Sequence, residues 1–397
     1  MLRAVRRAVD PGAVGALWLA IALAACVPAA APSAPAAANA AAPAVAASPA
    51  AAAPAGWDQL VAAAKQEGRL EIAGPPGQEY RNITVDDFGK AYPGITVEYS
   101  AARSNEHVPR IMAERAAGRF LTDVYLSGQV YTVLTLKPAG AVVPLRPELI
   151  LPEVVDESAW LGKHLTWCDD TEPFTCMLFQ GSAQGIIFYN TTMVNPAEFT
   201  SYWDALQPKW KGQIEATDIR PGVVGGVPSR FVFKNPALGP AWLEKLYGEM
   251  DVSVSGDQRQ LIDRLAQGQF PLAIFLSGGD VVKAAALGLP VAAIPSDQLK
   301  EGASVGPGNG AVAIMESAPH PNAARLFVNW LLSREGQISW QTHVQEPSLR
   351  TDIPKDGLNP ILVPKPGIDY VNAATEEYST LTFSDIGDIV TRGLEKR

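Results

Sequence analysis

The fold of this protein is indicated by residues 57–77, which read WDQLVAAAKQEGRLEIAGPPG. Leu60 and Ala64 fall on one face of an expected helix, and Gly68 stands where that helix should stop. The apolar stretch at 70–73 then predicts a strand, which glycine and proline bring to an end. A helix, a buried strand and a glycine-rich loop in this order form the repeating unit of an α/β fold.

The same alternation continues along the chain and calls for mostly parallel sheets with helices on both faces. The further elements that we predict are helices at 85–92, 109–117, 257–267 and 321–332, and strands at 95–99, 123–126, 185–189, 212–215 and 271–275.

Residues 57–397 are too many for one small core and suit two domains. The predicted strands end repeatedly in loops rich in glycine and serine. In open α/β sheets, ligands bind outside the carboxyl ends of the strands. Two such sheets that face each other across a cleft would place these loops on opposing walls. We therefore predict an α/β fold with two lobes and a ligand site between them.

The N-terminal residues carry the features of an export signal. Three arginines among the first seven residues precede an apolar run at 13–23 and then Leu23-Ala24-Ala25-Cys26. This end resembles the bacterial lipobox, in which the cysteine is diacylated and becomes the first residue of the mature chain. We expect residues 1–25 to be a lipoprotein signal peptide and Cys26 to carry the lipid. An uncleaved membrane anchor is the alternative, although Pro28 interrupts the apolar run.

Residues 26–56 are almost only alanine, proline and serine, without charged or aromatic side chains. Such a segment cannot bury enough apolar surface to offset the entropy lost on ordering. We interpret it as a tether that its prolines keep extended.

The charge balance limits the class of partner. The chain has 41 acidic and 32 basic residues, a net charge of −9. Phosphate binding needs clustered lysine and arginine, so we expect no nucleic-acid partner.

Cys168 and Cys176 lie close together in a turn-rich segment. Outside the cytoplasm such a pair favours a disulfide. A metal site that adds His164 and Asp169 is the alternative, but its spacing matches no compact zinc site. We predict the disulfide, with no metal and no cofactor.

Several short motifs, each weak by itself, occur in a specific order. They are Ala64-Lys65-Gln66-Glu67-Gly68, Ala91-Tyr92-Pro93-Gly94-Ile95-Thr96-Val97, Glu114-Arg115-Ala116-Ala117-Gly118, Tyr189-Asn190-Thr191, Trp203-Asp204-Ala205-Leu206, Pro208-Lys209-Trp210-Lys211-Gly212, Ala318-Pro319-His320-Pro321-Asn322-Ala323-Ala324 and Leu332-Ser333-Arg334-Glu335-Gly336-Gln337. In order and spacing they resemble the bacterial extracellular solute-binding proteins of ABC importers, family 1, of the type that includes ferric-ion receptors.

This resemblance implies a type II periplasmic-binding-protein fold with two or three hinge crossings. Its first lobe would comprise residues 57–185 and 310–345, and its second lobe residues 186–309 and 346–397. The lobes would close on a small solute, and the closed form would be recognised by the ABC transporter permease in the cytoplasmic membrane. We expect a monomer that is lipid-anchored to the outer face of that membrane, at the cell surface or in the periplasm.

The sequence departs from the ferric receptors after the strand at 271–275. Those proteins carry adjacent tyrosine ligands at this place, whereas this chain reads Leu276-Ser277-Gly278-Gly279-Asp280. We therefore expect an organic solute in place of iron.

The candidate solute-binding residues follow the predicted strands or lie on the predicted hinge. They are Gly74, Gln78, Arg103, Ser104, Ser127, Gly128, Tyr189, Asp218, Arg220, Ser277 and Gly278. Arg103 and Arg220 favour a small organic anion, such as a carboxylate or a phosphonate, because a guanidinium pairs with such groups through two hydrogen bonds. Polyamines and sugars remain open. The glycines could instead serve only turns, the arginines could be solvated, and Tyr189 could pack in the core.

We find no catalytic motif of the G-x-S-x-G, Walker or H-E-x-x-H kind, and we do not expect an enzyme. The same fold could also report to a membrane sensor, and the sequence leaves that alternative open.

Overall fold

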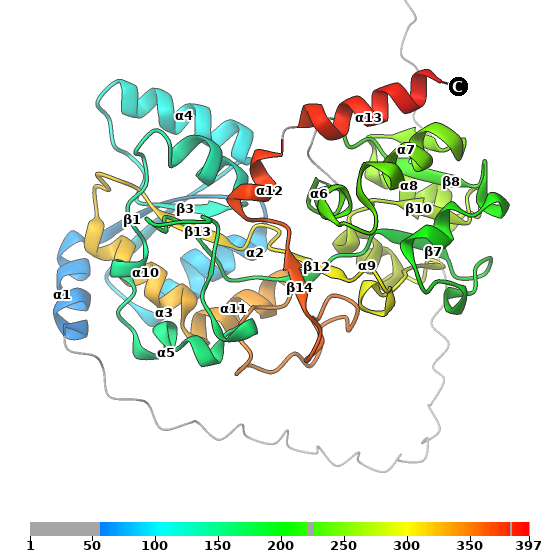
Figure 1. Cartoon of the computed structure of the whole chain (residues 1–397). Helices are drawn as coiled ribbons and strands as arrows, with labels where there is room; N and C mark the ends of the chain where they lie inside the picture. Colours follow the sequence, from blue (N-terminus) through cyan, green and yellow to red (C-terminus); the bar gives the residue numbers. More distant parts are fainter. Residues whose placement is uncertain (1–55, 221–225, 382, 397) are drawn as a thin grey trace, which may run out of the picture. The chain divides into compact units, whose positions relative to one another are not determined.

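The computed structural model describes residues 56–220, 226–381 and 383–396 (Figure 1). The predicted signal peptide, Cys26 and all of the predicted tether except Gly56 lie outside this part of the chain.

The first lobe is built on a six-stranded sheet with the order β2-β1-β3-β13-β5-β4. The strands are β1 Arg69–Gly74, β2 Thr96–Ala101, β3 Val124–Ser127, β4 Thr166–Trp167, β5 Met177–Leu178 and β13 Ala311–Ile314. β1 pairs in parallel with β2 and β3, whereas β13 is antiparallel to β3 and to β5. The expectation of a mostly parallel sheet was therefore wrong here. β13 returns to this sheet from a distant part of the chain, so its direction is not set by a βαβ crossover.

Helices surround this sheet (Figure 1). They are α1 Trp57–Glu67, α2 Gln78–Arg81, α3 Phe88–Ala91, α4 Ser104–Ala116, α5 Pro152–Val155, α10 Pro321–Leu332 and α11 Arg334–Val344. α1 packs against α10. Phe88 packs edge-on against Phe327 and Trp330, which closes the core beside α3.

Helix α4 begins at Ser104, five residues before the predicted start at Pro109, which lies inside the helix. Proline lacks an N–H group and therefore removes one hydrogen bond of a helix interior, which is why the sequence suggested a boundary there. Buried His107 and Val108 hold the turn that precedes the proline.

The second lobe is built on a five-stranded sheet with the order β11-β7-β10-β8-β9. Its strands are β7 Ile187–Asn190, β8 Ile214–Thr217, β9 Ser253–Ser255, β10 Leu272–Ile274 and β11 Val291–Ala293. Its helices are α6 Gly226–Lys234, α7 Gly239–Glu249, α8 Gln258–Ala266, α9 Gly278–Ala286 and α13 Phe383–Glu395. This sheet is mixed as well, because β7 is antiparallel to β10 and β11. Each large sheet is packed in hydrophobic residues of its own.

A three-stranded sheet, β14-β12-β6, lies on the connections between the two lobes. Its strands are β6 Ser182–Ala183, β12 Ala303–Gly306 and β14 Tyr370–Asn372. β6 comes between β5 and β7 along the chain, and β12 comes between β11 and β13. The chain thus passes from one large sheet to the other through neighbouring strands, which is the arrangement of a two-lobed periplasmic-binding-protein fold.

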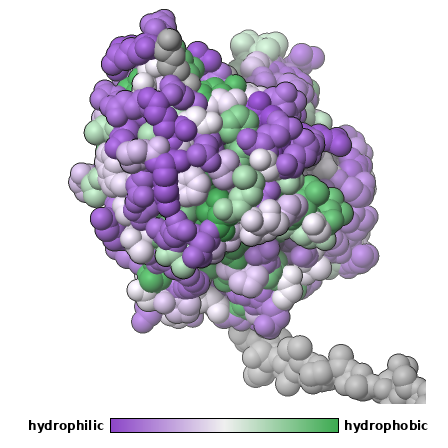
Figure 2. Space-filling view, turned by 90° about the vertical axis from the view of Figure 1, so that its right-hand side faces the viewer, coloured by the Kyte–Doolittle hydropathy of each residue, from purple (hydrophilic) through white to green (hydrophobic). Residues whose placement is uncertain are grey.

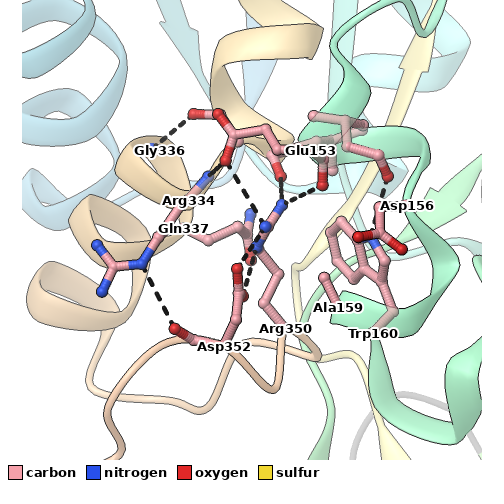
Figure 3. A network of polar contacts seen from close by, with 12 residues as sticks. Glu153, Asp156, Ala159, Trp160, Arg334, Gly336, Gln337, Arg350 and Asp352 are labelled. Atoms are coloured by element: carbon pink, nitrogen blue, oxygen red, sulfur yellow. Dashed lines mark hydrogen bonds and ion pairs between the residues drawn. The ribbon is translucent and has the colours of Figure 1, made fainter. Parts of the chain in front are cut away.

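The C-terminal segment contacts both lobes. Arg350 is 1% exposed and donates to the carbonyl oxygens of Glu153 and Leu332 and to the carboxylate of Asp352 (Figure 3). Helix α13, later in the same segment, packs against α7 in the second lobe. The lobe boundaries that we drew from the sequence, including the assignment of 346–397 to the second lobe, stay predictions.

The predicted disulfide between Cys168 and Cys176 is present. Beside it, Lys137 forms ion pairs with Asp169 and Glu376, so Asp169 is already bound to a cation. Within the described residues there is no cluster of histidine, cysteine and carboxylate side chains that could hold a metal ion. Nor does any helix in the described ranges have the length and apolar character needed to cross a membrane.

The surface on the side of the second lobe is mainly hydrophilic, with smaller hydrophobic areas interspersed (Figure 2). Leu287 at the end of α9 is 84% exposed, and isolated residues of this kind are normal on protein surfaces.

Candidate functional site

A pocket of about 380 Å³ is lined by loops of both lobes and by the strands that connect them. Its lining comprises 128–130, 182–185, 226–228, 276–280 and 307–308, together with Arg230, Glu346 and Leu362. The volume is in the range of small-molecule sites. Other cavities of similar size lie beside the disulfide and beside α11, but neither of these two is lined by strand-end loops of both large sheets.

Arg230 gives the pocket a buried positive charge. It lies in the middle of α6, whose neighbouring residues Phe231 and Val232 are also buried, and it is only 2% exposed. Burial lowers the pKa of its guanidinium, but arginine remains charged in proteins at neutral pH. A guanidinium can bind a carboxylate or a phosphonate through two parallel hydrogen bonds.

The first turn of α9 forms another part of the wall. Ser277 is the N-cap, and its hydroxyl accepts from the backbone N–H of Asp280 at 3.4 Å. The first N–H groups of a helix have no partner inside the helix, and together with the helix dipole they favour negative charge. Phe275, just before this turn, has a left-handed backbone with φ of 62°. That conformation is unfavourable for a bulky residue and is maintained by burial of its ring.

The first lobe contributes the residues that follow β3. Gln129 is 2% exposed and lines the pocket beside Gly128. Its side-chain Nε2 has no hydrogen-bond partner among the described residues. A buried amide without a partner is costly, so this donor is available for a ligand atom.

Glu346, which follows α11, places a carboxylate in the same pocket. Its Oε2 accepts hydrogen bonds from Gln180 Nε2 and, at 2.7 Å, from Ser182 Oγ. Gln180 is itself held by Trp340, whose Nε1 donates to Gln180 Oε1 at 2.8 Å. Burial raises the pKa of Glu346, and the hydrogen bond from Ser182 opposes that rise.

Three of the residues singled out from the sequence line this pocket: Gly128, Ser277 and Gly278. The other eight lie elsewhere. Gly74 is buried under the Tyr99 ring, and its carbonyl oxygen accepts from His107 Nε2 at 3.0 Å. Gln78 and Arg103 are exposed, and Gln78 donates to Asn82.

Ser104 and Ser127 share a hydrogen bond of 2.7 Å, and neither lines the pocket. Tyr189 lies on the strand between β10 and β11 and packs in the core of the second lobe. Asp218 and Arg220 form an ion pair with each other at 2.7 Å. Solute binding by the predicted residues is not tested by these contacts and stays a prediction.

Arg230, Gln129 and Glu346 were missed by the sequence reasoning. For Arg230 a signal existed, because a single arginine stands in the otherwise apolar run Arg230-Phe231-Val232-Phe233. Gln129 directly follows the predicted Ser127-Gly128 loop. Glu346 follows no predicted strand, and only the tertiary structure brings it to the pocket.

A family model described as bacterial extracellular solute-binding protein matches residues 71–338. No curated protein matches the chain.

Solved structures of similar fold include ferric iron-binding protein A from Mannheimia haemolytica in an open conformation. It has a TM-score of 0.63 and 14% identity, covering 83% of this chain and 99% of that one. Apo FutA2 from Synechocystis PCC6803 has a TM-score of 0.62 and 17% identity, covering 82% and 98%. AfuA from Actinobacillus pleuropneumoniae, with fructose-6-phosphate bound, has a TM-score of 0.56 and 17% identity, covering 83% and 97%. At these identities the similarity shows the fold alone.

Proposed function

Because this chain belongs to the bacterial extracellular solute-binding proteins, we propose that it captures a small organic anion between its lobes and delivers it to an ABC importer permease. Its role is binding, with no chemical step. The lipid anchor at Cys26 and the monomeric state belong to the same proposal.

The observation that carries the choice of an anion is the position of Arg230 in the pocket. Its side chain is buried, and the N-terminal turn of α9 lies in the same wall. A positive side chain and the positive end of a helix together favour a negatively charged ligand group. The unpaired Nε2 of Gln129 supplies a further donor from the first lobe.

The proposed capture of the solute depends on binding groups that come from both lobes. Gln129 comes from the first lobe, whereas Arg230 and Ser277 come from the second. A solute that contacts both walls stabilises the arrangement in which the walls are close, and this shifts the population of the receptor towards that arrangement. The permease would then recognise the loaded form.

Ferric iron is the principal alternative, because one of the similar structures named above is a ferric iron-binding protein. The described residues that line the pocket include no tyrosine and no histidine, and their carboxylates are Asp280 and Glu346. This donor set lacks the phenolate oxygens that the sequence comparison with ferric receptors calls for, which supports an organic solute.

A thermal-shift screen of the purified protein tests the proposal. The panel contains ferric citrate, carboxylates, phosphonates, sugar phosphates, polyamines and sugars. A solute at 1,000 times its dissociation constant adds about 4 kcal/mol of stability, which raises the melting temperature by several degrees. We expect an anion to give the shift, and we expect R230Q to abolish it.

The matched control is R119Q, which removes an exposed arginine outside the pocket. It should leave the shift unchanged. A shift from ferric ion alone would contradict the choice of an organic anion. The absence of a shift from every compound would contradict the receptor function itself.

A further inference from the structure

The pocket holds a second charged group that an anion alone does not explain. Glu346 lines the same cavity as Arg230, so the two walls carry charges of opposite sign. Asp280 also lines it, but its side chain is 51% exposed and pairs with Lys283. Glu346, and not Asp280, is therefore the carboxylate that we consider for an ion pair with the ligand.

The two oxygens of Glu346 differ. Oε2 accepts from Gln180 and Ser182. Oε1 has no hydrogen bond among the described residues, and it lies near the backbone of Gly279 in the wall of the pocket. The chain Trp340–Gln180–Glu346 fixes the carboxylate in place. An acceptor that is held rigidly at a pocket wall with one free oxygen is positioned for a donor on the ligand.

The positive charge near Glu346 is exposed and compensates the carboxylate only weakly. Lys283 is the cation that acts on it, and the Lys283 side chain is 78% exposed and lies next to Asp280. Water screens an exposed charge of this kind. Burial raises the pKa of Glu346. A cationic group of the solute beside Oε1 would oppose that rise.

We propose that the solute is amphoteric, with an anionic group that binds at Arg230 and Gln129 and a protonated amine that binds Oε1 of Glu346. This inference rests on the proposed receptor function and names the substrate class of the same pocket. Small amino carboxylates and amino phosphonates have this chemistry.

The test compares pairs of probes that differ only in the amine. The pairs are 4-aminobutanoate with butanoate, and 2-aminoethylphosphonate with ethylphosphonate. Isothermal titration calorimetry on the unaltered protein should show at least tenfold tighter binding of the amine-bearing member of a pair. Equal affinities within each pair would overturn the inference, and this comparison needs no variant.

The variant E346Q then tests whether Glu346 is responsible for the tighter binding of the amine-bearing probes. A glutamine keeps a carbonyl oxygen that can accept from Ser182, but it lacks the negative charge. We expect the advantage of the amine to fall to less than twofold in E346Q and to persist in D280N, the matched control at the same pocket. Melting temperatures of the unliganded variants within a few degrees of the unaltered protein show that both fold. An amine advantage that survives in E346Q would overturn the role of Glu346.

The failure of the inference can be told apart from the failure of the proposed function. If ferric citrate, fructose 6-phosphate or a sugar binds and neither amine-bearing probe does, the inference is wrong and the receptor function stands. If none of these compounds binds, both are wrong.

Discussion

Arg350 should anchor the C-terminal segment on the first lobe, and its replacement by methionine should destabilise the protein strongly. The guanidinium is 1% exposed and lies 5.3 Å from the centre of the Trp160 ring. It donates to the carbonyl oxygens of Glu153 at 2.9 Å and Leu332 at 3.2 Å. It also makes a two-point contact with Asp352 at 2.9 and 2.7 Å.

The size of the effect follows from what each partner loses. Leu332 is fully buried, so its carbonyl group would lose a partner without gaining water, which costs about 1–3 kcal/mol. The contact with Trp160 is desolvated and contributes about 1–2 kcal/mol. The Asp352 side chain is 38% exposed and can return to water, so its loss adds about 1 kcal/mol at most. Methionine restores part of the apolar contact, and we expect R350M to lose about 2–4 kcal/mol.

The assay is urea unfolding followed by tryptophan fluorescence, with the slope of the transition checked to be unchanged. R334A is the matched control, because Arg334 lies in the same network but makes one long side-chain contact, 3.4 Å to the carbonyl oxygen of Asp352 (Figure 3). It should cost about 0.5 kcal/mol or less. A loss in R350M no larger than that in R334A would refute this account of how the segment is held.

Three further outcomes follow from buried groups and from the disulfide. Burial raises the pKa of Glu215 to about 7 despite the Arg264 guanidinium 2.8 Å away. The folded state therefore keeps a proton on Glu215 that the unfolded state releases above about pH 4.3. The stabilisation linked to this proton is complete below that pH and is lost as the pH rises through 7. E215Q should remove this loss of stability from the dependence of the urea midpoint on pH. A pH dependence of unchanged shape would contradict the assignment to Glu215. Burial lowers the pKa of Lys355 to about 8, whereas an unfolded lysine stays protonated to about pH 10.4, so stability should rise between these values and K355M should lack the rise. Opening the Cys168–Cys176 disulfide, which spans a sequence separation of 8, should cost about 2–3 kcal/mol in the chain-entropy relation, and an unchanged urea midpoint after reduction would argue against it.

The elements of the fold could be predicted from the sequence because their signals are local. The helical face of Leu60 and Ala64 and the strand that follows were confirmed as α1 and β1. The Cys168–Cys176 pair could be predicted from its spacing and from the expected compartment. The order of the short motifs indicated the family, which the family model then showed. Strand direction was predicted less well, because β7 and β13 enter their sheets after the chain has crossed between lobes.

The composition of the pocket was decided by the tertiary structure. The rule that ligands bind at the ends of strands selected Gly128, Ser277 and Gly278, which line the pocket because their loops follow β3 and β10. It could not tell that Asp218 and Arg220 pair with each other, or that Tyr189 packs in the core of the second lobe. Gln129, Arg230 and Glu346 are separated by about a hundred residues each along the sequence, and each comes from a different part of the fold. The local pattern thus determined the helices, the strands and the family, whereas the charges that meet in the pocket depend on how the chain returns on itself, because a side chain's partners are set by distance in space.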